Sequence, residues 1–248
     1  TSLDMQGFSV SVCALDAGDE ALLSAPTPIC HWPPMKTIVE GAVVPLPDGL
    51  AAIKAMPSPH DPTKIFLTGC CEALIAAEED LNALDAKSGD GDTGSTLANA
   101  SRALIGAMDS LPLADKTQLY RAIGQELSET MGGSSGVLLA IFFAAAGDAA
   151  SSGYTMQQAL QAGLERMQQI GGAKLGDRTL VDALAPALAV LPVSIQDAAK
   201  AARTGANHTA TLTRAKAGRA AYVNPEHLEG HNDPGAEAVA ILFEHLAR

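Results

Sequence analysis

From residue 63 onward, apolar residues recur at the i, i+3, i+4 and i+7 spacing of amphipathic helices, and short Gly, Asp or Pro segments separate the runs. Ser110-Leu111-Pro112 interrupts the pattern, and Asp233-Pro234 places a capping carboxylate before a proline at a first helical position. The pattern predicts eight helices, over residues 63–84, 95–109, 114–131, 134–149, 155–170, 178–191, 194–213 and 233–247. Short connections favour antiparallel neighbours, so we expect an all-α fold, an eight-helix antiparallel up-and-down bundle or barrel.

The first 62 residues follow a different pattern. Residues 7–15 alternate apolar with small polar side chains, as in a half-buried strand. One strand cannot form a domain, so residues 1–25 are predicted to be the last strand and a short helix of a domain whose other strands are absent from this sequence. Prolines are concentrated from Pro26 to Pro62, which predicts a linker over 26–62 and a helical domain over 63–248.

Composition excludes several classes of protein. Aromatic residues make up only 4% of the chain, so Ala, Leu, Ile, Val and Met must form the core. The net charge of -12 disfavours binding to nucleic acid or to an anionic membrane surface. Neither a continuous apolar run of about 18 residues nor a secretory signal pattern is found, which predicts a cytoplasmic protein. The cysteines, which show no CxxC spacing, are predicted to be reduced thiols: Cys13, Cys30, Cys70 and Cys71.

The candidate chemistry is concentrated between residues 84 and 96. Asp85, Asp90 and Asp92 are three carboxylates within eight residues, and glycines separate them. Such carboxylates repel one another unless a cation lies between them. Oxygen ligands suit magnesium or calcium, and magnesium held by few carboxylates leaves positions for phosphate oxygens. The pattern therefore predicts a metal site that handles a nucleotide.

Two well-known binding motifs match this segment only in part. Gly89, Gly91 and Gly94 fit the GxGxxG of dinucleotide-binding proteins, but a helix rather than a strand precedes them. The calcium-binding EF-hand loop requires different residues at several positions. A solvated turn whose aspartates cap the next helix is the simplest alternative. The sequence has no GxxxxGK[ST] phosphate-binding loop.

Further loops carry small, hydroxyl-bearing or charged residues: residues 131–136, 171–179, 216–219 and 232–235. The first, Met131-Gly132-Gly133-Ser134-Ser135-Gly136, precedes an apolar helix whose N-terminus favours an anion. In an up-and-down bundle, the turns after alternate helices emerge at one end, so we expect these loops to lie beside the aspartates. Arg178 and Arg219 are candidates to stabilise phosphate charge. His208, His227 and His231 lack ligand spacing and are interpreted as ordinary loop or surface residues.

In order and spacing these segments resemble the nucleotide-binding domain of dihydroxyacetone kinases. The motifs are Leu84-Asp85, Gly89-Asp90-Gly91-Asp92-Thr93-Gly94, Met131-Gly132-Gly133-Ser134-Ser135-Gly136, Gly176-Asp177-Arg178-Thr179, Ala217-Gly218-Arg219-Ala220 and Asp233-Pro234-Gly235. The resemblance implies an eight-helix barrel that binds ATP and two magnesium ions at one end, with Asp85, Asp90 and Asp92 as metal ligands. It also implies residues that bind the phosphates of the nucleotide: Thr93, Gly94, Ser95, Thr96, Ser134 and Ser135. On the adenosine side it implies Gly171, Thr179, Leu180, Asp233, Pro234 and Gly235, with Arg219 close by. Some family members carry His at the position of Thr93.

The resemblance extends to residues 1–25, which are similar to the closing strand of the family's triose-binding domain. It implies the fused, ATP-dependent kind of kinase, which phosphorylates dihydroxyacetone or glyceraldehyde and is a homodimer in its full-length form. The sequence contains no evident general base, as expected if it holds half of an active site. Three alternatives remain open: a non-enzymatic nucleotide-binding subunit or regulator, the ADP-carrying subunit of a phosphotransferase-linked kinase, and a helical interaction domain without nucleotide affinity.

Overall fold

The computed structural model describes residues 14, 16–25 and 55–248 of the chain. The chain divides into two units, Thr1–Ala52 and Ile53–Arg248, which are described separately. In the first unit, helix α1 (Ala17–Ser24) begins at a capping box, in which Asp16 accepts from the backbone N–H of Asp19 while the Asp19 carboxylate accepts from that of Asp16. The predicted strand over residues 7–15, apart from Ala14, and most of the predicted linker lie outside the described residues, so both stay predictions.

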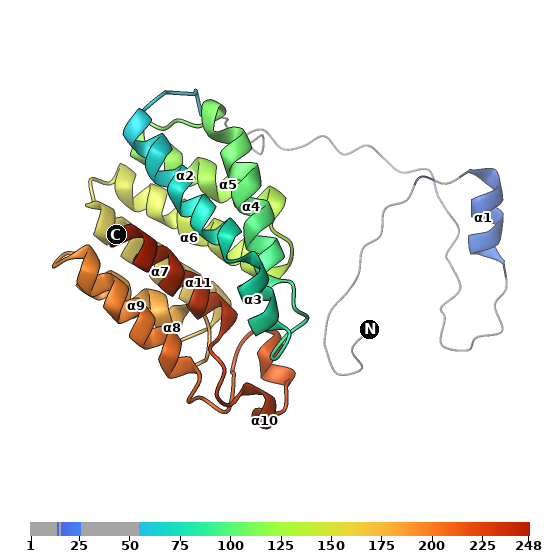
Figure 1. Cartoon of the computed structure of the whole chain (residues 1–248). Helices are drawn as coiled ribbons and strands as arrows, with labels where there is room; N and C mark the ends of the chain where they lie inside the picture. Colours follow the sequence, from blue (N-terminus) through green and yellow to red (C-terminus); the bar gives the residue numbers. More distant parts are fainter. Residues whose placement is uncertain (1–13, 15, 26–54) are drawn as a thin grey trace. The chain divides into compact units, whose positions relative to one another are not determined.

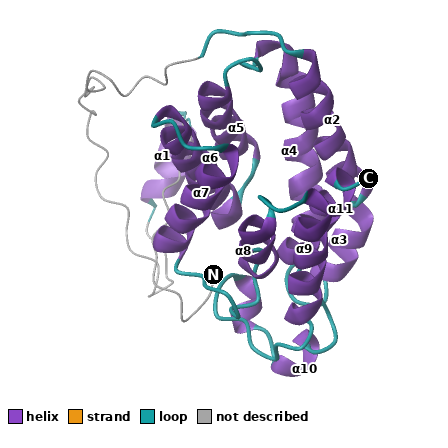
Figure 2. Cartoon of the chain, turned by 90° about the vertical axis from the view of Figure 1, so that its left-hand side faces the viewer, coloured by secondary structure: helices purple, strands orange, loops and turns teal. Residues whose placement is uncertain are grey.

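The second unit is helical, and no β-strand occurs within residues 55–248 (Figure 2). The all-α prediction is therefore confirmed. The main helices are α2 (Asp61–Ala76), α3 (Glu78–Asp85), α4 (Thr93–Ala107), α5 (Lys116–Thr130), α6 (Gly133–Ser151), α7 (Met156–Gly171), α8 (Val181–Val190), α9 (Ile195–Thr209) and α11 (Pro234–Leu246).

The predicted number of eight helices differs from this structure in two places. The predicted helix 63–84 is two helices, which join at Ala77, and it begins two residues earlier than expected because His60 caps α2 and Pro62 occupies its first turn. A short helix, α10 (Pro225–Leu228), follows the N-cap Asn224 and was not predicted. The other predicted helices are present, with ends shifted by up to four residues.

Side-chain caps explain most of the helix starts. Asp115, Thr155 and Ser194 each accept a hydrogen bond from a backbone N–H in the first turn of α5, α7 and α9. Asp233 does the same for α11, with Pro234 directly after it, as the sequence predicts. The local chemistry of these residues thus marks where α5, α7, α9 and α11 begin.

In the second unit the main helices that follow one another along the chain pack against one another, and α11 packs on α2 (Figure 1). The packed pairs run from α2 and α3 on α4 through to α8 on α9 and α9 on α11. α11 also contacts α2 and α3, so the order of contacts closes on itself. This arrangement is the one expected for up-and-down connectivity, and it places alternate turns at the same end.

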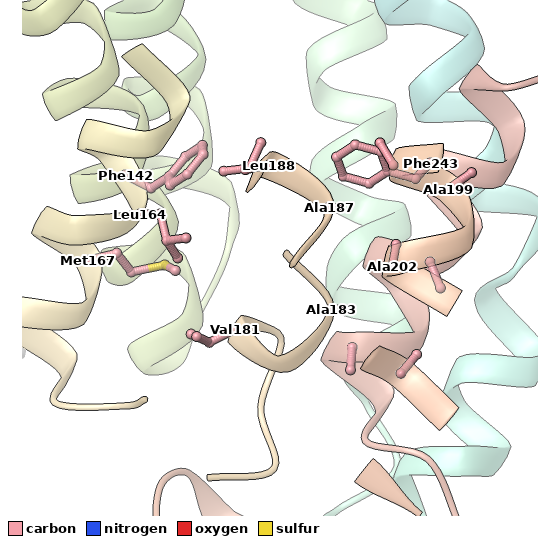
Figure 3. Close-up of a cluster of buried hydrophobic side chains, with 14 residues drawn as sticks. Phe142, Leu164, Met167, Val181, Ala183, Ala187, Leu188, Ala199, Ala202 and Phe243 are labelled. Carbon is pink, nitrogen blue, oxygen red and sulfur yellow. The ribbon is translucent and has the colours of Figure 1, made fainter. Parts of the chain in front are cut away.

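Small residues bring the helix axes close together. The largest core cluster combines alanines of α8, α9 and α11 with Phe142, Leu164 and Leu188, several of which are labelled in Figure 3. A Cβ added at Gly205 of α9 would collide with the backbone carbonyl of Asp182 in α8. The scarcity of aromatic residues is therefore compensated by close packing of backbones.

Two of the four cysteines lie in the described part of the chain. Cys70 and Cys71 are free thiols, and burial raises the pKa of each to about 11, so both are protonated at neutral pH.

Helix α6 is apolar along most of its length. Among the described residues it is the one helix whose length and composition would allow it to cross a membrane. A single such helix is weak evidence for a membrane span, because core helices of other proteins meet the same criterion.

Candidate functional site

The three aspartates of the 85–92 loop lie close together. Each of Asp85, Asp90 and Asp92 offers a carboxylate oxygen within 4.8 Å of those of the other two. Within the described residues, no other group of acidic, His or Cys side chains meets this criterion. Asp85 is buried, whereas Asp90 and Asp92 are exposed, so the cluster has one anchored member and an open side.

Asp85 holds the loop in shape. Its Oδ2 accepts hydrogen bonds from the backbone N–H groups of Gly91, Asp92 and Thr93 at 3.0–3.1 Å. A Cβ at residue 89 would collide with Asp85 Oδ1, and Gly91 has a φ of 79°, so both positions favour glycine. The sequence of this loop therefore specifies a tight turn around one carboxylate.

The start of α4 is fixed against α3. Ser95 donates its backbone N–H to Asn82 Oδ1 at 3.0 Å, and its hydroxyl donates to Glu78 Oε1 at 3.0 Å and accepts from Asn82 Nδ2 at 2.9 Å. Gly94 is buried at the same interface, where a Cβ would collide with the Glu78 carbonyl. The phosphate contact of Ser95 stays a prediction, and its hydroxyl would have to leave α3 to make that contact.

The cluster fits a divalent cation. Three mutually close carboxylates are unfavourable without positive charge between them, and carboxylate oxygens are the ligands preferred by magnesium and calcium. The open side formed by Asp90 and Asp92 leaves room for oxygens that the chain does not supply. The donor set therefore agrees with the predicted metal site, although the metal assignment itself stays a prediction.

The 131–136 segment forms the start of α6. Ser134 and Ser135 lie exposed in its first turn, Gly133 has a φ of 71°, and a Cβ at Gly136 would collide with the Met131 carbonyl. Gly171, at the end of α7, lies beside Leu138 of α6, because a Cβ added there would come within 2.9 Å of Leu138 Cδ2. The predicted segments 131–136 and 171–179 thus adjoin the same helix, α6. The two serine hydroxyls and the N-terminus of α6 are open to solvent.

The turn before α8 is organised by Asp182, which was not among the residues predicted from the sequence. This buried carboxylate accepts from the Gly176 N–H at 2.6 Å through Oδ1 and from the Thr179 N–H at 2.8 Å through Oδ2. Thr179 and Leu180 are half-buried beside it. Asp182 lies within an apolar helical run, and a carboxylate at such a position could have been recognised as a cap for the preceding turn.

The turn before α11 meets the turn before α8. Asp233 accepts from the Ala236 N–H at 2.9 Å and donates its own N–H to Thr209 Oγ1 at 2.7 Å. A Cβ at Gly235 would lie 3.2 Å from Leu180 Cβ. Two segments more than 50 residues apart, both predicted to bind the adenosine part of a nucleotide, therefore lie side by side.

The loop before α11 also approaches the aspartate loop. An open groove of about 430 Å³ lies between them, lined by residues of α3 and α11 and by the connecting loops: Asp80, Ala83, Leu84, Lys87, Gly230, His231, Asn232, Glu237 and Ile241. Of the turns predicted to lie at one end of the bundle, the turn before α11 is thus close both to the turn before α8 and to the aspartate loop.

The two candidate arginines have different outcomes. Arg178 is 1% exposed, and its Nη2 donates to the carbonyl oxygens of His231 at 2.7 Å and Leu228 at 3.2 Å. The sequence predicted that Arg178 stabilises phosphate charge. In the structure its side chain is instead buried against carbonyl groups of the protein. Arg219 begins the short 3₁₀ segment Arg219–Tyr222, and its side chain lies outside the described part of the structure.

Asp233 has a perturbed acidity. Burial raises its pKa to about 6 from an ordinary value of 3.8, and the nearby charge of Asp182 adds to the shift. The hydrogen bond from Ala236 and the positive charge of Arg178 act in the opposite direction without cancelling it. The ionised form of this side chain is therefore disfavoured in the folded protein.

As the pH rises from about 4 to about 6, ionisation of Asp233 is expected to lower the free energy of unfolding. The folded state binds this proton more tightly than the unfolded state, so the contribution is present below pH 3.8 and is lost as the pH passes the folded pKa. The loss is on the order of 1–3 kcal/mol. The Asp233→Asn variant keeps a capping side chain and should lack this fall.

Urea unfolding at several pH values measures the effect as the difference between the two proteins. The contributions of other titrating groups cancel in this difference, because they are the same in both proteins. Examples are Glu78 and Glu244, whose pKa values are lowered by hydrogen bonds from Arg102 and Arg203. Parallel pH profiles of the wild type and Asp233→Asn would contradict the prediction.

Comparisons with known proteins agree on one family. The family model described as the DAK2 domain matches residues 87–248, which include Asp90 and Asp92 but begin just after Asp85. A dihydroxyacetone kinase of Citrobacter freundii is 41% identical over 100% of this chain and 46% of its own length. A triokinase/FMN cyclase of Mus musculus is 34% identical over 98% of this chain and 45% of its own. The chain thus spans about half the length of the curated relatives it matches.

Solved structures give the same result. The crystal structure of the C. freundii dihydroxyacetone kinase in its native form matches with a TM-score of 0.74 and 39% identity, over 94% of this chain and 42% of that one. The structure of that kinase in complex with AMP-PNP and Mg²⁺ matches with a TM-score of 0.71 and 37% identity, over the same shares of the two chains.

Proposed function

Because this chain belongs to the DAK2 domain family, we propose that it supplies the nucleotide-binding half of a kinase that transfers phosphate from ATP to dihydroxyacetone. The observation that carries the proposal is the set of three mutually close carboxylates, two of them exposed, in a loop that shares a groove with the segment before α11. The names of the relatives, dihydroxyacetone kinase and triokinase, support phosphoryl transfer to a three-carbon carbonyl compound.

The residues of this chain would act mainly by holding and orienting the nucleotide. Asp85, Asp90 and Asp92 would bind magnesium, and bound magnesium supplies positive charge that offsets the negative charge of the phosphates. Three backbone N–H groups keep the Asp85 carboxylate in place, so this ligand does not have to reorganise when the nucleotide binds. Ser134 and Ser135 would donate hydrogen bonds to phosphate at the N-terminus of α6.

The acceptor half of the reaction is assigned to a triose-binding domain outside this sequence. The chain spans about half the length of its curated relatives, and its three-aspartate cluster is assigned to the metal rather than to the acceptor. In the proposed kinase, dihydroxyacetone or glyceraldehyde would be bound and activated by that other domain. The same proposal includes two bound magnesium ions, a homodimer of the full-length protein and a cytoplasmic location.

Calorimetric titration with ATP, with and without magnesium, tests the nucleotide-binding part. We expect binding that requires magnesium, because without it the aspartates repel the phosphates. Absence of binding in both conditions would contradict the proposal and favour a helical interaction domain.

A coupled assay tests catalysis. Addition of a separately produced triose-binding domain and dihydroxyacetone to this chain with ATP should release ADP, and omission of either protein should abolish the release. ATP binding without ADP release would favour a regulator. Copurified ADP that does not exchange with ATP would favour the ADP-carrying subunit of a phosphotransferase-linked kinase.

A further inference from the structure

The turn that precedes α8 contains a buried cation with an unusual backbone. Arg178 has a φ of 61°, which is uncommon for any residue other than glycine, and its side chain is 1% exposed. Such a conformation costs on the order of 1 kcal/mol and persists only where surrounding contacts fix it. The strained residue lies between Asp177 and Thr179, in the turn that Asp182 holds.

The guanidinium joins this turn to a distant segment. Nη2 donates to the carbonyl oxygens of Leu228, the last residue of α10, and of His231, which lies two residues before the Asp233–Gly235 turn. Within the described residues, Nε and Nη1 are buried and have no hydrogen-bond partner. The charge of Arg178 is attracted electrostatically to Asp233, and Asp182 repels Asp233.

This arrangement is poorly explained by stability alone. A buried cation with unpaired donors is costly, and an apolar side chain of similar volume would avoid the cost. The contacts that Arg178 does make have a different consequence: they set the distance between the turn before α8 and the turn before α11. Leu180 and Gly235, which meet at that junction, are both predicted to lie at the adenosine part of the nucleotide.

We propose that Arg178 is a positioning residue, which connects the turn before α8 to the Leu228–His231 segment and thereby shapes the binding site for the base and ribose of the nucleotide. The proposal rests on the proposed function in that it assumes a nucleotide. It replaces the expectation that Arg178 contacts phosphate. Arg178 then affects affinity for ATP without affecting affinity for the phosphates alone.

The test compares Arg178→Met, which removes the donors, with Arg178→Lys, which keeps a positive charge and at least one donor. Both carry a Cβ, so the backbone strain is that of the wild type. Arg166→Met is the matched control, because Arg166 is exposed on α7 and bonds only with Gln169 among the described residues. Each protein is titrated with magnesium–ATP and, separately, with magnesium–triphosphate, which has no base or ribose.

Arg178→Met is expected to weaken ATP binding about tenfold and to leave triphosphate binding within about twofold, because only the base end of the site is loosened. Arg178→Lys should recover part of the loss, and Arg166→Met should behave as the wild type. Equal losses for ATP and triphosphate would overturn the proposal in favour of a phosphate contact. Unchanged ATP affinity in Arg178→Met would overturn it as well.

Hydrogen exchange tests the same inference without any nucleotide. The N–H of Gly230 donates to the Ala210 carbonyl at 2.9 Å, and that of Asp233 donates to Thr209. Both amides should exchange at least about tenfold faster in Arg178→Met than in the wild type, because the segment loses its attachment to the α8 turn. Unchanged exchange would overturn the proposal. A wild type that binds no ATP would contradict the proposed function, and faster exchange in Arg178→Met would then still show that Arg178 holds this segment to the α8 turn.

A second variant covers the case in which Arg178→Met does not fold. Thr209→Val removes the hydroxyl that accepts the Asp233 N–H and so loosens the same turn from its other side. It should weaken ATP binding and spare triphosphate binding, as Arg178→Met does. Equal losses for both ligands in Thr209→Val would overturn the link between this turn and the base end of the site.

Discussion

Replacement of Asp90 and Asp92 by asparagine is expected to abolish magnesium-dependent ATP binding while leaving the helical content unchanged. The two exposed carboxylates lie within 4.8 Å of each other and of Asp85, and they form the open side of the cluster. Asparagine keeps the size of each side chain but removes two negative charges that the cation requires. Affinity should fall at least about 100-fold, which corresponds to about 2.7 kcal/mol.

A charge-matched control separates this effect from a general change in net charge. Glu72→Gln combined with Glu165→Gln also removes two exposed carboxylates, from α2 and α7, and should bind magnesium–ATP as the wild type does. Titration calorimetry measures the affinities, and circular dichroism measures the helical content. Unchanged binding in the aspartate double variant would refute the metal site and, with it, the basis of the proposed function.

Much of the bundle can be predicted because local chemistry determines it. Asp115, Thr155, Ser194 and Asp233 are caps that can be recognised without knowledge of the fold, and the apolar spacing between them gives the helices. The aspartate loop is equally local, since Asp85 and the amides it holds lie within eight residues of one another. The fold class and the proximity of the three carboxylates could therefore be predicted from sequence.

Features that depend on packing could not be predicted in this way. The break at Ala77 lies in a segment of good helix formers, and it becomes intelligible only when Ala77 and Leu81 are seen packed with Ala238 of α11. Ser95 has the appearance of a phosphate ligand, yet its hydroxyl is bonded to Glu78, which is 17 residues away. The burial of Arg178 likewise depends on carbonyl groups about 50 residues further along the chain. In each case the deciding partner is distant in sequence.

Gly94→Ala is expected to destabilise the protein by at least about 2 kcal/mol, which is a large effect for the addition of one methyl group. The new Cβ would collide with the Glu78 carbonyl and lie 2.8 Å from Asn82 Oδ1 and 2.9 Å from the Asn82 backbone nitrogen. Because backbone atoms cannot move aside, the start of α4 would have to separate from α3, and the bonds between Asn82 and Ser95 would break.

Gly106→Ala, in the same helix, is the matched control for Gly94→Ala. A Cβ at residue 106 meets no atom within 4 Å, so alanine should stabilise α4 there by about 0.5–1 kcal/mol relative to glycine. Urea unfolding should therefore shift in opposite directions for the two variants. Magnesium–ATP affinity should fall in Gly94→Ala alone, because the shifted first turn of α4 carries Asp92 and Thr93 away from Asp85. Equal stability of the two variants would show that the contact between α3 and α4 does not fix the geometry of the aspartate loop.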